Sequence, residues 1–299
     1  MENPLPHQAS PGKSPGLRLG IIADPQYADL PPDAGMNRYY HKSLDKMRQA
    51  IELFNSRNLD LVILLGDLID RGEQHFQPAL DVLATCRHEC LLLPGNHDFA
   101  IAPQLRQGVY ARFAMPARYY SRSLQGIRLL VTDGCEVSTF ATQPGSAQQE
   151  EARRQLVRLR AERALNAHDW NAAMSESQIE WLKRQLDEAG RAGEKALVLG
   201  HYPLHPFTDH CLWNGKEVAS MLAAHPAALA HFSGHDHRGG YGQLGTMPFI
   251  TFCGMVDGEA ETAFAIATVT AQALTIEGFG RQPSLQLPQN GAPANFMTE

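Results

Sequence analysis

Five short segments of this chain carry residue types that can bind metal ions or move protons. They are Asp24-Pro25-Gln26, Gly66-Asp67-Leu68-Ile69-Asp70, Gly95-Asn96-His97-Asp98, Gly200-His201 and Gly234-His235-Asp236-His237. Each segment directly follows a short, mostly apolar run that is typical of a buried strand. The carboxyl ends of parallel strands are where α/β sheets bind their ligands. The repeated pattern therefore predicts that the five segments form one site.

The donor atoms in these segments exceed what a single tetrahedral zinc ion uses. The candidate metal ligands are Asp24, Gln26, Asp67, Asn96, His201, His235 and His237. Mixed nitrogen and oxygen ligands without thiolate suit two divalent ions, with Mn²⁺ favoured and Fe, Zn²⁺ or Mg²⁺ as alternatives. Two ions about 3.5–4 Å apart hold a hydroxide between them and neutralise phosphoryl oxygens during in-line displacement. We therefore expect hydrolysis of a phosphoester or phosphoanhydride, without a Ser or Cys nucleophile.

A single Asp or His after a strand is weak evidence, because most such residues cap loops or lie satisfied in the core. The ordered series of motifs, each after an apolar run, is what favours a shared site. Several other histidines lack this setting and are assigned to packing or to the surface. They are His7, His41, His75, His88, His168, His225 and His231.

The order Asp-x-Gln, Gly-Asp-x-x-Asp, Gly-Asn-His-Asp, Gly-His-x-Pro and Gly-His-x-His resembles the calcineurin-like metallophosphoesterase superfamily over about residues 17–280. The resemblance implies two metal ions that share Asp67 as a bridging ligand. One ion would also bind Asp24, Gln26 and His237, and the other Asn96, His201 and His235. His97 would not bind metal but would contact the scissile phosphate and stabilise or protonate the leaving oxygen.

Gln26 departs from the superfamily pattern, because most members carry His at this position of the first motif. An amide oxygen is a harder and weaker donor than imidazole, so one ion should be held loosely and activity should depend on added Mn²⁺. The string from Asp24 to Asp29 resembles one subgroup, the manganese-dependent ADP-ribose/CDP-alcohol diphosphatases. Arg38-Tyr39-Tyr40, Cys211–Asn214 and Gly278–Pro283 continue this resemblance.

The subgroup resemblance implies cleavage of the pyrophosphate in a nucleoside diphosphate linked to a sugar or an alcohol, such as ADP-ribose or CDP-choline. The pocket must then hold a flat base beside the metals. Cys211 and Trp213 would form one wall and Tyr40 the other, with ordinary packing as the competing interpretation of the aromatic residues. Arg238, followed by two glycines, would approach a phosphate or a ribose.

Other functions fit the motifs less well. A Ser/Thr protein phosphatase would explain Arg71-Gly72, but that group carries Arg where this chain has Pro94. A cyclic-nucleotide phosphodiesterase, or another phosphatase of the same superfamily, is the alternative to the diphosphatase. A repair exonuclease would need a basic DNA-binding surface. A non-catalytic scaffold should have lost a metal ligand or His97.

Alternating strands and helices must position the motifs. Strands over 17–23, 60–65 and 90–93, joined by helices over about 41–57 and 77–85, predict three parallel neighbours in one sheet. A hairpin at Gln125-Gly126 and a helix from Ser175 follow, and the last third returns to strands up to a hairpin at Ala271-Gln272. We therefore predict an α/β (α+β) fold, in which two packed mixed β-sheets are flanked by helices as a four-layer αββα sandwich.

The pattern also predicts where the domain begins and ends. A single domain is expected over 17–281, with a charged helix in an insertion at 134–174 that packs on the rim. Residues 1–16 are rich in Pro, Gly and Ser, which favours a disordered tail over a signal peptide. From Gln282 the apolar pattern is lost, so 282–299 is predicted to be a C-terminal tail.

The composition is ordinary for a soluble globular protein. The 299 residues carry a formal net charge of -6, which gives no support to a nucleic-acid or membrane partner. Five scattered cysteines without a Cys-x-x-Cys pair indicate reduced thiols. No apolar run reaches the roughly 20 residues that span a bilayer. We expect a cytoplasmic enzyme that acts on a small-molecule nucleotide and has no obligate protein partner.

Overall fold

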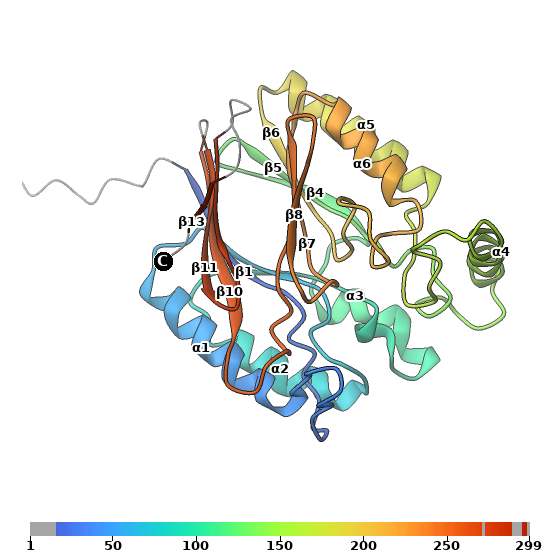
Figure 1. Cartoon of the computed structure of the whole chain (residues 1–299), viewed down its shortest axis with the longest axis horizontal. Coiled ribbons are helices and arrows are strands. Elements are labelled where there is room, and N and C mark those ends of the chain that lie inside the picture. Colours follow the sequence, from blue (N-terminus) through green and yellow to red (C-terminus); the bar gives the residue numbers. More distant parts are fainter. Residues whose placement is uncertain (1–15, 271–272, 289–294, 298–299) are drawn as a thin grey trace, which may run out of the picture.

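The computed structural model describes residues 16–270, 273–288 and 295–297. Two β-sheets pack face to face, with helices on their outer sides (Figure 1). The first sheet contains β1 (Leu17–Ile22), β2 (Leu61–Leu65), β3 (Cys90–Leu93), β10 (Ala263–Val269), β11 (Ala273–Gly280), β12 (Ser284–Pro288) and β13 (Asn295–Met297), in the order β13-β12-β11-β10-β1-β2-β3. Strands β1, β2 and β3 are parallel neighbours, as predicted.

The second sheet has the order β4-β5-β6-β7-β9-β8. Its strands are β4 (Tyr120–Leu124), β5 (Ile127–Val131), β6 (Lys195–Leu199), β7 (Ala228–Ser233), β8 (Gly240–Leu244) and β9 (Met247–Thr251). The helices are α1 (Ser43–Ser56), α2 (Phe76–Leu83), α3 (Val109–Arg112), α4 (Ala147–Ala161), α5 (Glu176–Arg191) and α6 (Gly215–Ala224). In Figure 1, α1 and α2 cover the first sheet, and α5 and α6 cover the second. The predicted four-layer sandwich is confirmed.

Strand β2 shows how the sequence encodes these layers. All five of its residues are buried. Leu61, Ile63 and Leu65 belong to the core between the two sheets. Val62 and Leu64 belong to the core shared with the helices. Because successive side chains point to opposite faces of a sheet, a strand covered on both faces must be apolar at every position.

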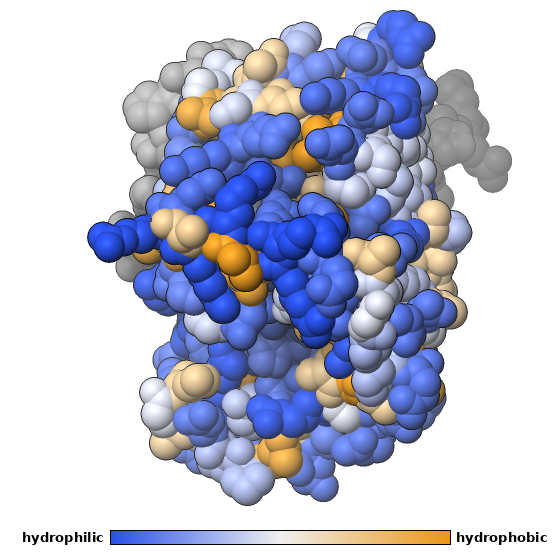
Figure 2. All heavy atoms as spheres, turned by 90° about the vertical axis from the view of Figure 1, so that its right-hand side faces the viewer, coloured by the Kyte–Doolittle hydropathy of each residue, from blue (hydrophilic) through white to orange (hydrophobic). Residues whose placement is uncertain are grey.

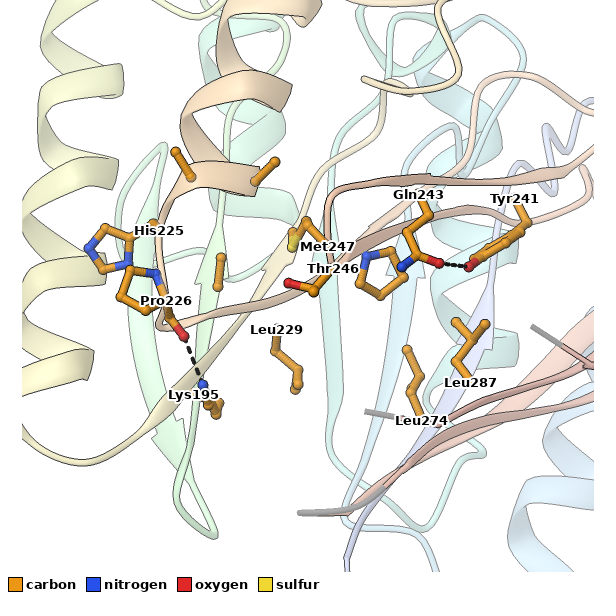
Figure 3. Close-up of a pocket in the computed structure, with 14 residues that line it drawn as sticks. Lys195, His225, Pro226, Leu229, Tyr241, Gln243, Thr246, Met247, Leu274 and Leu287 are labelled. Carbon is orange, nitrogen blue, oxygen red and sulfur yellow. Dashed lines mark hydrogen bonds between the residues drawn. The ribbon is translucent and has the colours of Figure 1, made fainter. Parts of the chain in front are cut away.

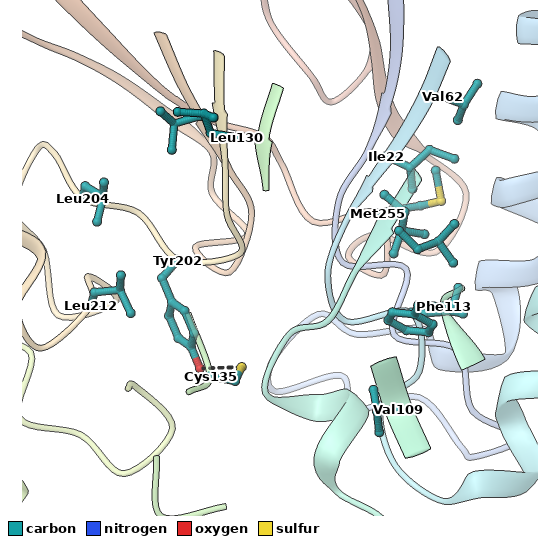
Figure 4. Close-up of a cluster of buried hydrophobic side chains, with 14 of the residues drawn as sticks. Ile22, Val62, Val109, Phe113, Leu130, Cys135, Tyr202, Leu204, Leu212 and Met255 are labelled. Atoms are coloured by element: carbon teal, nitrogen blue, oxygen red, sulfur yellow. Dashed lines mark hydrogen bonds between the residues drawn. The ribbon is translucent and has the colours of Figure 1, made fainter. Parts of the chain in front are cut away.

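The core beneath the helices extends over both sheets. Figure 4 shows Ile22, Val62 and Met255 on one side of this core and Leu130 and Leu204 on the other. Helices α1, α2 and α5 contribute apolar faces at helical spacing, which is why they could be predicted within a few residues of their ends, whereas α3 and α6 were not predicted.

Helix α5 begins at the residue that the sequence indicated. The hydroxyl of Ser175 accepts a hydrogen bond from the backbone N–H of Gln178 at 3.2 Å, so Ser175 caps the helix. The Gln178 side chain does not return to the cap as in a full capping box. Its Oε1 accepts from the N–H of Asp133 at 2.8 Å. The cap therefore ties α5 to the loop after β5.

The C-terminal segment differs from the predicted tail. Strand β12 pairs with β11 and with β13, so the first sheet extends beyond Gln282. Leu285 and Leu287 are buried between polar neighbours, a two-residue alternation too short to be recognised beside the surrounding Pro and Gln residues. Strand β8 was likewise not predicted. The N-terminal tail prediction falls, apart from residue 16, outside the described residues.

The insertion at 134–174 contains α4, which lies at one side of the molecule, apart from the two sheets (Figure 1). Leu156 and Leu159 pack against Trp213, while Val157 on the outer face is 66% exposed. Figure 2 shows this side of the molecule, on which hydrophilic side chains predominate. The charged residues of α4 therefore form a solvated face.

A cavity of about 340 Å³ lies at the end of the sandwich where Lys195 begins β6 and Met247 begins β9. Figure 3 shows its mixed lining, to which Leu229, Leu274 and Leu287 contribute apolar side chains and Lys195 and Gln243 polar ones. The predicted metal ligands follow the opposite, carboxyl ends of the strands, so this cavity is separate from them. Within the described residues, every helix is too short or too polar to cross a membrane.

The buried imidazole of His231 on β7 lends itself to a stability test. Neither ring nitrogen has a hydrogen-bond partner among the described residues, and burial lowers the pKa of His231 to about 3. An unsatisfied buried polar group costs about 1–3 kcal/mol, so His231→Leu should raise the free energy of unfolding at pH 7 in urea titrations.

The same substitution should change the pH dependence of stability. Because the pKa of the folded state lies below the roughly 6.5 of an unfolded imidazole, the neutral ring favours folding above pH 6.5, and this contribution is lost as the pH falls towards 3. The wild type should therefore lose more stability between pH 7 and pH 4 than His231→Leu. The exposed His41, changed to Leu, is the control. Equal pH dependence of wild type and His231→Leu would contradict the assignment.

Candidate metal centre

The predicted ligands meet where β1, β2, β3, β6 and β7 end. Asp67, just after β2, lies at the centre of the group. Its Oδ2 is 3.0 Å from Gln26 Nε2 and 3.4 Å from His201 Nε2. Asp67, His201 and His235 offer donor atoms that all lie within 4.8 Å of one another. Segments far apart in the sequence therefore converge on one buried carboxylate.

The remaining donors lie on either side of Asp67. On one side, His237 Nε2 is 3.2 Å from Gln26 Nε2 and 3.6 Å from Asp24 Oδ1. On the other side, His201 Nε2 is 3.2 Å from Asn96 Oδ1. The structure thus brings all the predicted donors together in two groups that share Asp67. Which atoms bind which ion stays a prediction.

Four of these residues hold backbone conformations that non-glycine residues rarely adopt. Asp24, Gln26, Asp67 and His235 have φ angles of 48°, 43°, 54° and 66°. Strain of this kind costs on the order of 1–3 kcal/mol per residue and is typical of functional sites. The strained backbone directs these side chains from the strand ends towards a common point.

The Asp98 carboxylate holds the Asp67 loop in this conformation. Its Oδ2 accepts hydrogen bonds from the N–H groups of Asp67 and Gly95, both at 2.9 Å, and its Oδ1 accepts one from Ile69 at 3.2 Å. Asp98 is fully buried and therefore acts on the site through backbone contacts. Gly95 is required for another reason, because a Cβ at this position would lie 2.2 Å from Asp67 Oδ1.

Hydrogen bonds on the far side of two imidazoles decide which nitrogen faces the site. His201 Nδ1 is 2.8 Å from the carbonyl oxygen of Leu65, which can only accept a hydrogen bond, so Nδ1 carries a hydrogen and Nε2 is the nitrogen that faces Asp67 and Asn96. His237 Nδ1 is 2.9 Å from Asp257 Oδ1, so here too Nδ1 carries a hydrogen and Nε2 faces the other ligands. Such outer contacts fix the tautomer of metal-binding histidines.

The third imidazole, that of His235, is fixed in the opposite sense. The Asn171 amide donates through Nδ2 to the carbonyl oxygens of Asn166 and Asp209, so its Oδ1 is the acceptor that lies 3.0 Å from His235 Nε2. Nε2 therefore carries the hydrogen, and Nδ1 is the nitrogen left to bind a metal.

The donor set fits divalent cations. Gln26 Oε1 is buried without a hydrogen-bond partner among the described residues, which leaves a buried acceptor oxygen beside the other donors. Burial raises the pKa of Asp24 to about 6, although His237 and His201 act to lower it. Burial also opposes ionisation of Asp67, but His201 and His97 outweigh it and hold the pKa of Asp67 well below its ordinary value. Buried carboxylates beside oriented imidazoles form a metal-binding environment.

His97 lies at the edge of the cluster with 23% of its side chain exposed. Its backbone N–H donates to Asp67 Oδ1 at 2.8 Å, and its ring Nδ1 is 3.0 Å from the Asp70 carboxylate. Burial opposes protonation, but Asp67 and Asp70 raise the pKa of His97 above its ordinary value. The ring is therefore placed to interact with an anion or to donate a proton next to the metal ligands.

The structure does not support the predicted walls of a base pocket. Trp213 is only 5% exposed, and its ring packs against α4 while Nε1 donates to the carbonyl of His168 at 3.0 Å. Cys211 is fully buried, with its Sγ 3.4 Å from the carbonyl oxygen of Pro206. Trp213 packs in the core because the insertion supplies apolar partners that the sequence pattern did not place.

The other two predicted substrate contacts have different surroundings. Tyr40 is 5% exposed and packs with Ala28 and Val256. Arg238 has 71% of its side chain exposed and forms an ion pair with Asp236 at 2.8 Å. Of the four, only Arg238 extends well into solvent.

Sequence reasoning missed Asn171 and Asp257, which orient His235 and His237. Asn171 lies in the insertion and belongs to no motif. Asp257 is followed by Gly258, and this pair indicates no more than a turn. Neither has a signal in one sequence, because its role depends on a contact across the fold.

Replacing Asn171 should weaken one metal site. Asn171→Leu removes the acceptor that fixes the His235 tautomer, so the affinity for one of two Mn²⁺ ions should fall about 10–100-fold. Electron paramagnetic resonance of free Mn²⁺ during titration measures both affinities. The control is Asn166→Leu, which also removes a buried amide but has no contact with His235. Equal losses in the two variants would show that Asn171 acts only on stability.

Comparisons with known proteins agree with this geometry. The family described as calcineurin-like phosphoesterase matches residues 17–239. The manganese-dependent ADP-ribose/CDP-alcohol diphosphatase of Arabidopsis thaliana is 28% identical over 269 residues, covering 78% of this chain and 83% of the relative. The human protein of that name is 25% identical and covers 94% and 95%. A dimetal phosphatase from Danio rerio superposes with a TM-score of 0.82 at 25% identity, covering 93% of this chain and 100% of that one. This chain therefore belongs to the calcineurin-like phosphoesterase family and is a metal-dependent hydrolase.

Proposed function

We propose that this enzyme hydrolyses the pyrophosphate bond of nucleoside diphosphates linked to a sugar or an alcohol, with two Mn²⁺ ions as cofactors. The observation that carries the proposal is Gln26, which contacts both Asp67 and His237 in a group richer in oxygen than in nitrogen. Relatives that span nearly the whole chain bear the name manganese-dependent ADP-ribose/CDP-alcohol diphosphatase. Their names support the substrate class, and Gln26 supports the metal.

The side chains have distinct roles in the proposed reaction. Asp24, Gln26, Asp67 and His237 hold one ion, and Asp67, Asn96, His201 and His235 hold the other. When bound, the two ions supply Lewis-acid activation of water and neutralise charge on the phosphoryl group. Asp98 keeps Asp67 in its strained conformation, and His97 donates a hydrogen bond or a proton to the leaving oxygen.

Arginines near the ligands suit a substrate with a second phosphate. Arg71 follows Asp70, and 59% of its side chain is exposed; that of Arg238, after His237, is 71% exposed. The charge of Arg38 is close enough to act on the pKa of His97. In a diphosphate, one phosphate is attacked while the other needs a separate cation. These arginines supply such charge at the edge of the metal ligands.

A substrate panel tests the proposal. The purified protein with Mn²⁺ should convert ADP-ribose to AMP and ribose 5-phosphate, and CDP-choline to CMP and phosphocholine. Cyclic AMP, p-nitrophenyl phosphate and a phosphopeptide should react more slowly at equal concentration. Product chromatography distinguishes cleavage of the pyrophosphate from release of a terminal phosphate. A clear preference for cyclic AMP would assign the enzyme to the phosphodiesterases instead.

His97→Ala should separate chemistry from metal binding. The variant should retain two Mn²⁺ ions, because His97 is not among the proposed ligands, while kcat falls about 10²–10⁴-fold through loss of the proton donor. Metal analysis and steady-state kinetics measure the two effects. His225→Ala is the matched control, since its ring forms hydrogen bonds with Asp187 and Ala227 at the far end of the sandwich. A His97→Ala protein that has lost a metal ion would contradict the role given to His97.

A further inference from the structure

Lys46, on the buried face of α1, binds main-chain carbonyls instead of a carboxylate. It is 4% exposed, and its Nζ lies 2.9, 3.2, 2.9 and 2.6 Å from the carbonyl oxygens of Met255, Val256, Asp257 and Gly258. A buried charge is tolerated only when hydrogen bonds replace its hydration. Here four consecutive carbonyls converge on one ammonium group, much as they would on a bound metal cation. The ammonium therefore determines the conformation of residues 255–258, called here the 255–258 loop.

The 255–258 loop lies directly against two of the proposed metal ligands. The N–H of Met255 donates to the carbonyl of Ala23 at 2.9 Å, and that of Val256 donates to the carbonyl of Asp24 at 3.0 Å. Asp257 Oδ1 accepts from His237 Nδ1 at 2.9 Å. Lys46 is thus linked to both Asp24 and His237 through one short loop.

Close packing limits the freedom of this arrangement. The N–H of Gly254 donates to the carbonyl of His237 at 3.1 Å, and a Cβ on Gly254 would lie 2.5 Å from the His237 ring. The loop and the ring therefore fit one another in one arrangement. A shift of the loop would move the carboxylate that fixes the His237 tautomer.

We propose that Lys46 and Asp257 are positioning residues for the metal ion held by Asp24, Gln26, Asp67 and His237. Lys46 fixes the 255–258 loop, and Asp257 then fixes the His237 ring with Nε2 towards the metal. This ion needs such support more than its neighbour, because Gln26 is a weak donor and His237 is its single imidazole. The inference rests on the two-metal centre of the proposed function.

The role of Asp257 is tested by two substitutions, of which one removes the acceptor oxygen and the other keeps it. Asp257→Leu removes the acceptor and should weaken one Mn²⁺ site about 10–100-fold, leaving the other unchanged. Asp257→Asn keeps an acceptor oxygen and should recover most of the affinity. Long-range ¹H–¹⁵N correlation spectra of the metal-free protein report the His237 tautomer. The Nδ1–H form should predominate in the wild type and in Asp257→Asn but not in Asp257→Leu.

The role of Lys46 is tested by Lys46→Met, which keeps an unbranched side chain one atom shorter but removes the charge and the donors. It should weaken the same Mn²⁺ site and alter the His237 tautomer, whereas Lys183→Met, on the exposed face of α5, should change neither. Lys46→Gln retains two amide donors and supplies the same measurements if the methionine variant does not fold.

The outcomes separate the inference from the function on which it rests. A wild type that binds two Mn²⁺ ions, with variants that fold and bind both ions equally well, would overturn the inference alone. A wild type that binds no Mn²⁺ would overturn the proposed metal centre. No substrate is needed for either measurement, so an error in the substrate class would affect neither result.

Discussion

The Asp67 carboxylate is the constraint on which the rest of the site depends. It is fully buried, and it contacts Gln26 on one side, His201 on the other, and the backbone of His97. A carboxylate that two ions would share has to lie between both groups of ligands, so Asp67 must be held rigidly. The strained φ of Asp67 and the hydrogen bond from its backbone N–H to Asp98 supply this rigidity. A buried carboxylate is costly without partners, and the surrounding histidines make its ionised form stable.

The fold explains why the sequence could predict so much of the site. Strands such as β2 are buried on both faces and read as unbroken apolar runs, so the polar residue that follows stands out. Asp24, Asp67, Asn96, His201 and His235 all lie at such strand ends and were predicted to meet. The same logic predicted helices α1 and α5, because each buries one apolar face. Strand β12 was missed, since this short strand next to the edge of the sheet has only two buried leucines and leaves little periodicity.

Other parts could not be predicted because they depend on contacts across the fold. Asn171 and Lys46 act through hydrogen bonds to residues far along the chain, and no local pattern marks such partners. Trp213 was assigned to a pocket wall from the resemblance of its segment to the diphosphatase subgroup and from its residue type. Its burial follows from α4, which covers the ring with Leu156 and other apolar side chains. A residue's type indicates what it can do, but the packing around it decides whether a substrate can reach it.

The two halves of the metal centre differ in a way that bears on cofactor choice. One group contains two imidazoles, whose orientations are fixed by the Leu65 carbonyl and by Asn171. The other contains one imidazole and Gln26, whose Oε1 has no hydrogen-bond partner among the described residues. Oxygen-rich ligands would favour Mn²⁺ over softer ions, and the affinity of such a site would depend on how well its single imidazole is oriented. The hydrogen bond from His237 to Asp257 orients that imidazole, and it links metal binding to a loop outside the sequence motifs.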